Sequence, residues 1–338
     1  MGARPDHTGQ LTAEAPRAAI VIAAYNAEAT LERALRSAFA QTVPVEVLVV
    51  DDASQDGTAE LAERLSGPVP GAVVLRQPRN AGPAAARNRA IAAAAAPWIA
   101  VLDADDHMAP DRIARLVQEA EAKGLDFLAD DIYQVSETAP TATGQRLWSP
   151  QDFGRMQVSL AFFAEANTHG SRGRRSELGF VKPLMRRAFL QAHGLRYAET
   201  LRLAEDYMLY AQALAAGAAF QLVDPRGYFA VHRENSLSGQ HSTADLGALV
   251  QADRALLGRP DLEAAARAAI RRHCRQVHKE WAWRRMIDAV RAGDLRSIAA
   301  LGLEPPAVTA ALMGKLLQQA WLRSRRRFAP GGDRARRS

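Results

Sequence analysis

The sequence has little material for cross-links or membrane spans. A single cysteine, Cys274, occurs in 338 residues, which excludes an internal disulfide framework and a cysteine-based zinc site. The longest apolar run, residues 90–102, is interrupted by Pro97 and is shorter than the roughly 20 residues that a transmembrane helix needs. Residues 1–17 lack the apolar segment of a secretory signal, so we expect a flexible leader on a cytoplasmic protein.

Glycine-rich phosphate-binding loops are absent as well. Residues 23–29, which follow the first apolar run, contain no glycine, although a dinucleotide-binding fold places a Gly-x-Gly-x-x-Gly turn there. The P-loop pattern Gly-x-x-x-x-Gly-Lys-Ser/Thr occurs nowhere in the chain. These absences argue against a dehydrogenase and against a P-loop nucleoside triphosphatase.

Lysine is scarce, and positive charge is distributed unevenly. Four of the 43 basic residues are lysines, and the formal net charge is +6. Residues 241–338 hold 19 basic and 9 acidic residues, a net charge of +10, whereas residues 1–240 have a net charge of −4. The basic region has no aromatic-interleaved motif, so we expect an acidic body, a basic C-terminal region and no nucleic-acid partner.

Short apolar runs alternate with amphipathic or alanine-rich segments through the first 130 residues. Strands are expected at residues 18–24, 45–50, 72–75, 97–102 and 126–129, and helices at residues 28–40, 58–65, 80–95 and 110–123. This alternation predicts an α/β fold with a doubly wound, mostly parallel sheet. Such sheets bind ligands at the carboxyl ends of their strands, which is where polar residues cluster in this sequence.

The acidic residues after the fourth expected strand form a D-x-D pattern. Asp103 and Asp105 follow a buried apolar strand, and Asp52 ends the second strand. Carboxylates at this spacing can converge on one Mg²⁺ or Mn²⁺, which prefers hard oxygen ligands and accepts phosphate oxygens beside them. The alternative is a solvated acidic turn, which accounts for most chance matches to so short a pattern.

Four segments, in order, resemble the motifs of family 2 glycosyltransferases, which have the GT-A fold. They are residues 20–26 (IVIAAYN), 49–58 (VVDDASQDGT), 79–88 (RNAGPAAARN) and 98–106 (WIAVLDADD). The similarity covers residues 18–131 strongly and continues to about residue 240 through residues 203–210 (LAEDYMLY). The last hundred residues are not covered.

The resemblance implies a set of residues that bind a nucleotide-sugar donor. Ala24, Tyr25 and Asn26 belong to the nucleobase end, Asp52 accepts a hydrogen bond from the base, commonly uracil, and Asn80, Gly82 and Arg87 lie near the ribose and phosphates. The resemblance also makes Asp103 and Asp105 the Mn²⁺ or Mg²⁺ site, with Asp105 the more direct ligand, and it places Asp106 near the donor sugar.

Glu205 and Asp206 resemble the Glu-Asp motif whose aspartate is the general base in this family. They occupy the first turn of a helix expected over residues 204–216, where the helix dipole stabilises negative charge. A carboxylate there can accept a proton from an attacking sugar hydroxyl. The alternative is that both acids only cap the helix, and the four upstream motifs favour Asp206 as the base.

The segment after that helix is a weaker match. Residues 228–238 (YFAVHRENSLS) resemble a Tyr-Arg-x-His-x-x-Ser-x-Ser segment, but Phe229 replaces the usual arginine. His232 is expected either to ligate the metal, to contact the diphosphate or to be structural, and Arg233 to neutralise phosphate charge. Lys182, in a segment that resembles the strand entering the acceptor half, is either a ligand or a packing or solvated residue.

The C-terminal region is expected to be helical and basic. Val308, Leu312, Leu316 and Ala320 form an apolar stripe flanked by Met313, Leu317 and Trp321, and arginines follow it. Such helices either pack on the catalytic domain or lie on an anionic membrane surface. The expected parts are a leader (1–17), a nucleotide-sugar half (18–131), an acceptor half (132–240), a helical region (241–328) and a disordered basic tail (329–338).

Together these features predict an inverting, metal-dependent glycosyltransferase. We expect transfer from a nucleotide-diphosphate sugar, most simply a UDP-sugar, to a saccharide or lipid-linked saccharide in polysaccharide or glycolipid synthesis, with peripheral contact to the cytoplasmic face of a membrane. A nucleotidyltransferase of the same fold would need a glycine-rich basic loop after the first strand, which is absent. A non-catalytic sugar-nucleotide-binding or scaffold protein is the alternative from a different class.

Overall fold

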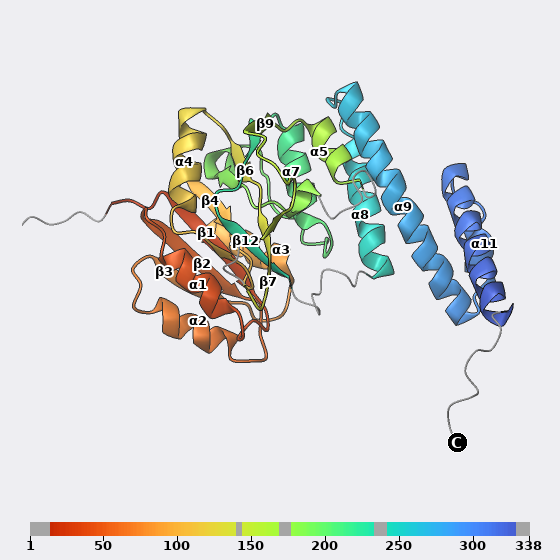
Figure 1. Cartoon of the computed structure of the whole chain (residues 1–338), viewed down its shortest axis with the longest axis horizontal. Coiled ribbons are helices and arrows are strands. Elements are labelled where there is room, and N and C mark those ends of the chain that lie inside the picture. The colour runs from red at the N-terminus through yellow and green to blue at the C-terminus, as the bar shows by residue number, and fades with distance from the viewer. Residues whose placement is uncertain (1–13, 140–143, 169–176, 233–241, 329–338) are drawn as a thin grey trace, which may run out of the picture. The chain divides into compact units, whose positions relative to one another are not determined.

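The structure is a computed structural model that describes residues 14–139, 144–168, 177–232 and 242–328. The chain divides into two compact units, residues 1–237 and 238–338. The described part of the first unit contains two β-sheets with helices α1–α7, and that of the second contains helices α8–α11 (Figure 1).

The first unit is built on a mixed eight-stranded sheet in the order β3-β2-β1-β4-β10-β6-β11-β9. Its strands are β1 (Ala18–Ala24), β2 (Val45–Asp51), β3 (Ala72–Arg76), β4 (Trp98–Val101), β6 (Phe127–Asp130), β9 (Arg155–Gln157), β10 (Leu184–Arg186) and β11 (Phe220–Val223). Its helices are α1 (Leu31–Phe39), α2 (Thr58–Ser66), α3 (Pro83–Ala93), α4 (Arg112–Ala122), α5 (Leu160–Ala166), α6 (Arg187–Ala192) and α7 (Glu205–Ala215), with a 3₁₀ turn at Leu178–Phe180.

The parallel part of this sheet follows the sequence prediction. β1 pairs in parallel with both β2 and β4, with Ala24 opposite Asp51 at the carboxyl end. The apolar run of β1 predicts burial on both faces, and Val21 and Ile22, whose side chains lie on opposite faces of the strand, are both fully buried. Because β1, β2 and β4 run in one direction, the polar residues that follow them are placed at one edge of the sheet. The predicted α/β fold with a mostly parallel sheet is confirmed.

Helix α1 starts later than its apolar pattern suggests, at Leu31 rather than near Glu28. The preceding turn bonds to the loop after β2 instead of continuing the helix. The backbone N–H of Ala27 donates to Oγ1 of Thr58 at 2.8 Å, and Oε2 of Glu28 accepts from the N–H of Gly57 at 3.0 Å. Tertiary bonding of this kind overrides helix propensity.

The first unit also contains a small second sheet that is absent from the sequence prediction. Its order is β5-β12-β7-β8, formed by β5 (His107–Met108), β7 (Tyr133–Ser136), β8 (Gln145–Arg146) and β12 (Tyr228–His232). β12 pairs antiparallel with β5, directly after the D-x-D segment. The ring of Phe229 stacks between His107 and Tyr133, with ring centroids 4.8 and 5.4 Å away.

The second unit contains α8 (Thr243–Leu257), α9 (Ala264–Ala292), α10 (Leu295–Leu301) and α11 (Pro306–Phe328). Ser242 and Asp245 form a capping box at the start of α8. Val308 and Leu312 of α11 are buried against Ala282 and Met286 of α9. Within the described residues, no helix combines the length and the apolar character that a bilayer span requires.

Candidate active site

Asp52, at the carboxyl end of β2, organises the loop between β3 and α3. Its Oδ1 accepts from the side-chain amide of Gln77 at 2.6 Å and from the N–H of Ala81 at 2.8 Å, and its Oδ2 accepts from the N–H of Gly82 at 2.7 Å. Two carboxylate oxygens have about four acceptor positions, so these three bonds leave one. The Asp52 carboxylate therefore holds the Asn80–Gly82 turn and retains capacity for one further donor.

The described residues include three non-glycine positions with positive φ, and each lies beside a predicted site residue. They are Asn26 (φ 47°), Ala53 (φ 60°) and Ala204 (φ 60°). Asn26 follows β1, Ala53 follows β2, and Ala204 precedes Glu205. A left-handed backbone costs an alanine about 1–2 kcal/mol, and such strain is typical of binding and catalytic sites.

Of the three residues predicted at the nucleobase end, Tyr25 and Asn26 are exposed just after β1. The ring of Tyr25 is 44% exposed, whereas Ala24 is buried and its carbonyl accepts from the N–H of Asp52 at 2.8 Å. The Asn26 side chain accepts from the N–H of Gln55 at 2.8 Å. The exposed Tyr25 therefore directly follows the residue whose backbone bonds to Asp52.

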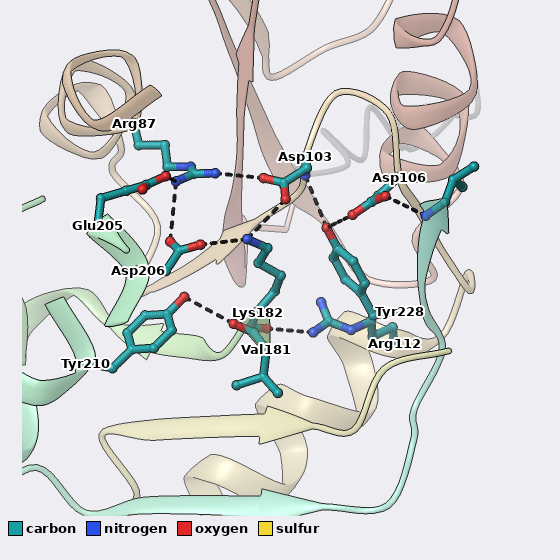
Figure 2. Close-up of polar contacts among 11 residues, drawn as sticks. Arg87, Asp103, Asp106, Arg112, Val181, Lys182, Glu205, Asp206, Tyr210 and Tyr228 are labelled. Carbon is teal, nitrogen blue, oxygen red and sulfur yellow. Dashed lines mark hydrogen bonds and ion pairs between the residues drawn. The ribbon is translucent and has the colours of Figure 1, made fainter. Parts of the chain in front are cut away.

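Three carboxylates from two distant segments meet at Arg87, on α3. The guanidinium donates to Oδ1 of Asp103 at 2.8 Å, to Oε1 of Glu205 at 3.0 Å and to Oδ1 of Asp206 at 3.3 Å (Figure 2). The Arg87 side chain is only 7% exposed, and its guanidinium lies 5.3 Å from the centre of the Tyr197 ring. The structure thus brings the D-x-D segment together with the Glu-Asp pair of α7.

The loop that carries Tyr197 is fastened to α3 by the residue next to Arg87. Asn88 donates from Nδ2 to the Tyr197 carbonyl at 2.9 Å and accepts from the Tyr197 N–H at 2.9 Å. Burial raises the pKa of the Tyr197 hydroxyl, so this ring stays neutral beside Arg87. No pattern in the sequence singles out Tyr197, because its contacts with α3 arise only in the fold.

Lys182 is the charged residue that sequence reasoning left unassigned. Its Nζ lies 2.7 Å from Oδ2 of Asp206 and 3.0 Å from Oδ2 of Asp103, and 7% of the side chain is exposed (Figure 2). Burial alone would lower the pKa of Lys182, but the charges of Asp103 and Asp206 raise it above its usual range. A buried lysine is almost always paired. A single lysine within the apolar segment around Val181 and Leu184 was therefore the sequence feature that could have indicated a buried ion pair.

The negative charge of Asp103 is balanced by two cations, Arg87 and Lys182. Burial alone would raise the pKa of Asp103, but the charges of Lys182 and Arg87 hold it below its usual range. One oxygen of the carboxylate faces Arg87 and the other faces Lys182. A solvated acidic turn, the alternative interpretation of the D-x-D pattern, does not describe this residue.

Comparison with known proteins fits this geometry. Residues 19–178 match the profile of Glycosyl transferase family 2. The succinoglycan biosynthesis protein ExoU of Rhizobium meliloti (strain 1021) is 42% identical over 326 residues, which span 96% of this chain and 93% of that relative. The chain belongs to glycosyl transferase family 2.

Two solved structures share the fold of this glycosyltransferase. Staphylococcus aureus TarS 1-349 in complex with UDP-GlcNAc superposes with a TM-score of 0.59 at 20% identity, over 89% of this chain and 85% of that one. The mannosyltransferase PcManGT from Pyrobaculum calidifontis, in complex with GDP-Man and Mn²⁺, superposes with a TM-score of 0.53 at 19% identity, over 90% and 87%. The GT-A fold predicted from the sequence is confirmed, and so is the expectation of an enzyme.

Within the described part of the chain, the D-x-D segment provides at most a partial site for a divalent ion, which substrate oxygens would have to complete. Among the described residues, no group of three or more histidine, cysteine, aspartate or glutamate side chains is arranged to hold a metal ion. Asp105 is half-buried, and its carbonyl accepts from Arg33 at 2.6 Å, which fixes this residue in the loop. Mg²⁺ and Mn²⁺ commonly bind through one or two carboxylates plus phosphate oxygens, and Asp105 suits such a partial site.

Asp106 of the glycosyltransferase is buried, and its side chain bonds to residues of β12. Its Oδ1 accepts from the N–H of Val231 at 2.8 Å and its Oδ2 from the hydroxyl of Tyr228 at 2.8 Å (Figure 2). Burial raises the pKa of Asp106 well above its usual range, and the charges of Asp103 and Asp105 add to this shift. These contacts connect the D-x-D segment to β12.

Of the two basic residues predicted at the end of β12, the structure describes His232. His232 is exposed at the last position of that strand, opposite Ser136 of β7. Arg233 lies outside the described residues.

Proposed function

We propose that this chain is an inverting glycosyltransferase that moves a sugar from a UDP-sugar to a hydroxyl of a saccharide or lipid-linked saccharide. We place the reaction in polysaccharide or glycolipid assembly at the cytoplasmic face of a membrane. The name of the relative ExoU, a succinoglycan biosynthesis protein, supports the polysaccharide assignment. The complex of TarS with UDP-GlcNAc supports a UDP-sugar. The observation that carries the proposal is the placement of Asp206 beside Asp103, through Arg87.

The donor nucleotide is proposed to bind along the strand ends. Tyr25 offers an exposed ring to the base, next to Ala24 and Asn26, and the remaining acceptor position of Asp52 takes a hydrogen bond from the base. The Asn80–Gly82 turn then faces the ribose and phosphates, where Arg87 adds positive charge from the start of α3. This arrangement uses the loop that Asp52 already holds in place.

Asp105 is proposed to bind Mn²⁺ or Mg²⁺ together with the donor diphosphate. When bound, such an ion supplies positive charge to the departing diphosphate. Asp103 is proposed to support this site through its place in the loop and through its ion pairs with Arg87 and Lys182. Asp106 is proposed to act through the same loop, which it anchors to β12. His232 remains a proposed contact for the metal or diphosphate, and Arg233 a proposed phosphate contact.

Asp206 is proposed to be the general base. Its carboxylate lies in the first turn of α7, where the helix dipole favours negative charge. The acceptor hydroxyl oxygen attacks the anomeric carbon, the bond from that carbon to the diphosphate oxygen breaks, and the hydroxyl proton moves to Asp206. UDP leaves with the bonding electron pair, and attack from the opposite face inverts the configuration. Glu205, the other acid on Arg87, is proposed to assist by holding that guanidinium.

The second unit is proposed to contact an anionic membrane surface. Met313, Leu317 and Trp321 recur every four residues on α11 and are 53%, 67% and 55% exposed. The net charge of +10 over residues 241–338 matches anionic lipid head groups. A helix with exposed apolar side chains and basic neighbours is typical of interfacial binding.

The test is a transfer assay with UDP-glucose, UDP-galactose, UDP-N-acetylglucosamine and GDP-mannose, with Mn²⁺ and alkyl glycosides as acceptors. We expect one UDP-sugar to give UDP and a glycoside of inverted configuration, assigned by NMR. Asp206→Asn is expected to lower the rate by about 10²–10⁴-fold, the usual contribution of a general base, while UDP still binds. Glu205→Gln serves as the matched variant on the neighbouring acid and is expected to lose less. Turnover by Asp206→Asn near the wild-type rate would remove the base assignment.

A further inference from the structure

Asp103 and Asp206 are joined twice, by two different cations. Arg87 contacts Oδ1 of both aspartates, at 2.8 and 3.3 Å, and Lys182 contacts Oδ2 of both, at 3.0 and 2.7 Å. The four side chains therefore form a closed ring of alternating charge, which we call the charge ring (Figure 2). No carboxylate oxygen of Asp103 or Asp206 is outside this ring.

The charge ring is almost fully enclosed at three of its four members. The side chains of Arg87, Lys182 and Asp206 are 7%, 7% and 12% exposed. Ion pairs that are shielded from solvent are screened little by salt, and loss of one partner leaves a buried charge without compensation. The ring therefore restrains the Asp206 carboxylate more strongly than a surface ion pair would.

Lys182 is itself held by buried groups on both sides of its backbone. The Tyr210 hydroxyl donates to the carbonyl of Val181 at 3.3 Å, and Nη2 of Arg112 donates to the carbonyl of Lys182 at 2.7 Å (Figure 2). Arg112 is paired with Asp130 at 2.6 Å, and neither side chain of that pair is exposed. The ammonium group therefore extends from a fixed backbone just before β10.

We propose that Lys182 is a positioning residue that sets where the carboxylate of Asp206 stands relative to the donor-binding loop. This inference rests on the proposed function, since it gives Lys182 a role only through Asp206. Arg87 alone does not fix the carboxylate, because its contact to Asp206 is the longest in the ring and Glu205 shares the same nitrogen. Lys182 supplies the second point of attachment, to the other oxygen.

The inference differs from two simpler roles for a buried lysine. A residue that only stabilised the fold would change the amount of folded protein and leave turnover per folded molecule unchanged. A residue that bound the donor diphosphate would change the affinity for UDP. A positioning residue changes kcat, because misplacement of a catalytic group by about 1 Å costs on the order of 100-fold.

The experiment compares Lys182→Met, Lys182→Arg, Asp206→Asn, the double variant Lys182→Met/Asp206→Asn and the surface control Lys123→Met in the full chain. Lys123 makes a peripheral contact of 3.7 Å with Glu119, so its replacement is expected to leave the rate unchanged. Turnover is measured with the UDP-sugar that reacts fastest in the panel above, and binding is measured by calorimetry with UDP and Mn²⁺.

We expect Lys182→Met to lower kcat by about 100-fold and to change the dissociation constant of UDP by less than about threefold. Lys182→Arg keeps the positive charge and is expected to recover part of the loss. In the Asp206→Asn background, Lys182→Met is expected to add no further loss, because the residue that it positions is already inactive.

Three results would overturn the inference: kcat of Lys182→Met close to wild type, weaker UDP binding with unchanged kcat, or losses that multiply in the double variant. If Lys182→Met does not fold, Lys182→Arg decides: a kcat below wild type with unchanged UDP affinity supports the inference, and a wild-type kcat overturns it. Failure of the proposed function is distinguishable from failure of this inference, because it appears as near-wild-type activity in the single variant Asp206→Asn.

Discussion

The hydroxyl of Tyr228 donates a hydrogen bond to Oδ2 of Asp106 at 2.8 Å and accepts one from the backbone N–H of Asp103 at 3.2 Å. Burial raises the pKa of the Tyr228 hydroxyl, and the nearby charge of Asp106 adds to this shift, so the hydroxyl keeps its proton. One side chain of β12 thus bonds the first residue of the D-x-D pattern and the residue that directly follows the pattern. The small sheet therefore supports the loop that carries Asp103 and Asp106.

Tyr228→Phe removes both bonds and retains the buried ring. We expect a loss of about 1–3 kcal/mol in the free energy of unfolding, the usual cost of a buried polar group left without its partner, and weaker UDP binding in Mn²⁺. Urea denaturation and calorimetry measure the two effects. Tyr133→Phe is the matched control, because it removes a hydroxyl from the adjacent strand β7. Unchanged UDP affinity in Tyr228→Phe would mean that the loop keeps its shape without this bond.

Asp105→Asn tests the proposed metal ligand. Removal of one carboxylate from a site that combines protein and phosphate oxygens should weaken the effect of Mn²⁺ on UDP binding by at least about tenfold. Calorimetric titrations of UDP with Mn²⁺ and with EDTA give that effect as a ratio of dissociation constants. Asp111→Asn, at the exposed start of α4, is the control and should keep the wild-type ratio. An Asp105→Asn variant that also kept it would exclude Asp105 as a ligand.

The sequence alone predicts those features that depend on a local pattern of residues. The apolar runs of β1 and β2, the proline at the start of α3 and the D-x-D pattern each depend on neighbouring residues, and their positions agree with the structure within a few residues. The late start of α1 at Leu31 depends instead on bonds from Ala27 and Glu28 to the loop after β2. No periodicity along residues 28–40 carries that information.

The same distinction between local patterns and tertiary contacts holds for the candidate site. Arg87, Asp103, Glu205 and Asp206 were all singled out by motif, but their common meeting point was not, because it requires α3 and α7 to approach each other. Lys182 shows the limit most clearly, since its environment in sequence is apolar and its partners come from two other segments. The pairing of a charged residue across a fold is set by topology, and Lys182 precedes β10, an antiparallel strand that the alternation did not predict.

Gly82→Ala tests whether the turn held by Asp52 serves the donor. Gly82 has φ 89° and ψ 166°, a region that residues with a Cβ rarely enter, and an added Cβ would meet no atom within 4 Å. The cost of the substitution is therefore conformational, about 1–3 kcal/mol. We expect this loss of stability together with weaker UDP binding.

Gly124→Ala is the matched control for that substitution. Gly124 also has a positive φ, 61°, and open space around an added Cβ, but it follows α4 and has no contact with the turn. We expect it to destabilise the fold by a similar amount, again measured by urea denaturation, without a change in UDP affinity. Equal UDP affinity in the two variants would show that the turn has no part in donor binding.

Leu317→Glu/Trp321→Glu tests the membrane surface proposed for α11. Each side chain is more than half exposed, and partial burial of such a side chain in the interface contributes about 1–2 kcal/mol. We expect the double variant to bind vesicles of phosphatidylglycerol and phosphatidylcholine at least about tenfold more weakly than wild type, measured by flotation. Leu303→Glu replaces a leucine that is 89% exposed outside α11, and it controls for one of the two added negative charges. If all three proteins float equally, or if wild type does not bind even at low salt, where charge attraction is strongest, α11 has another partner.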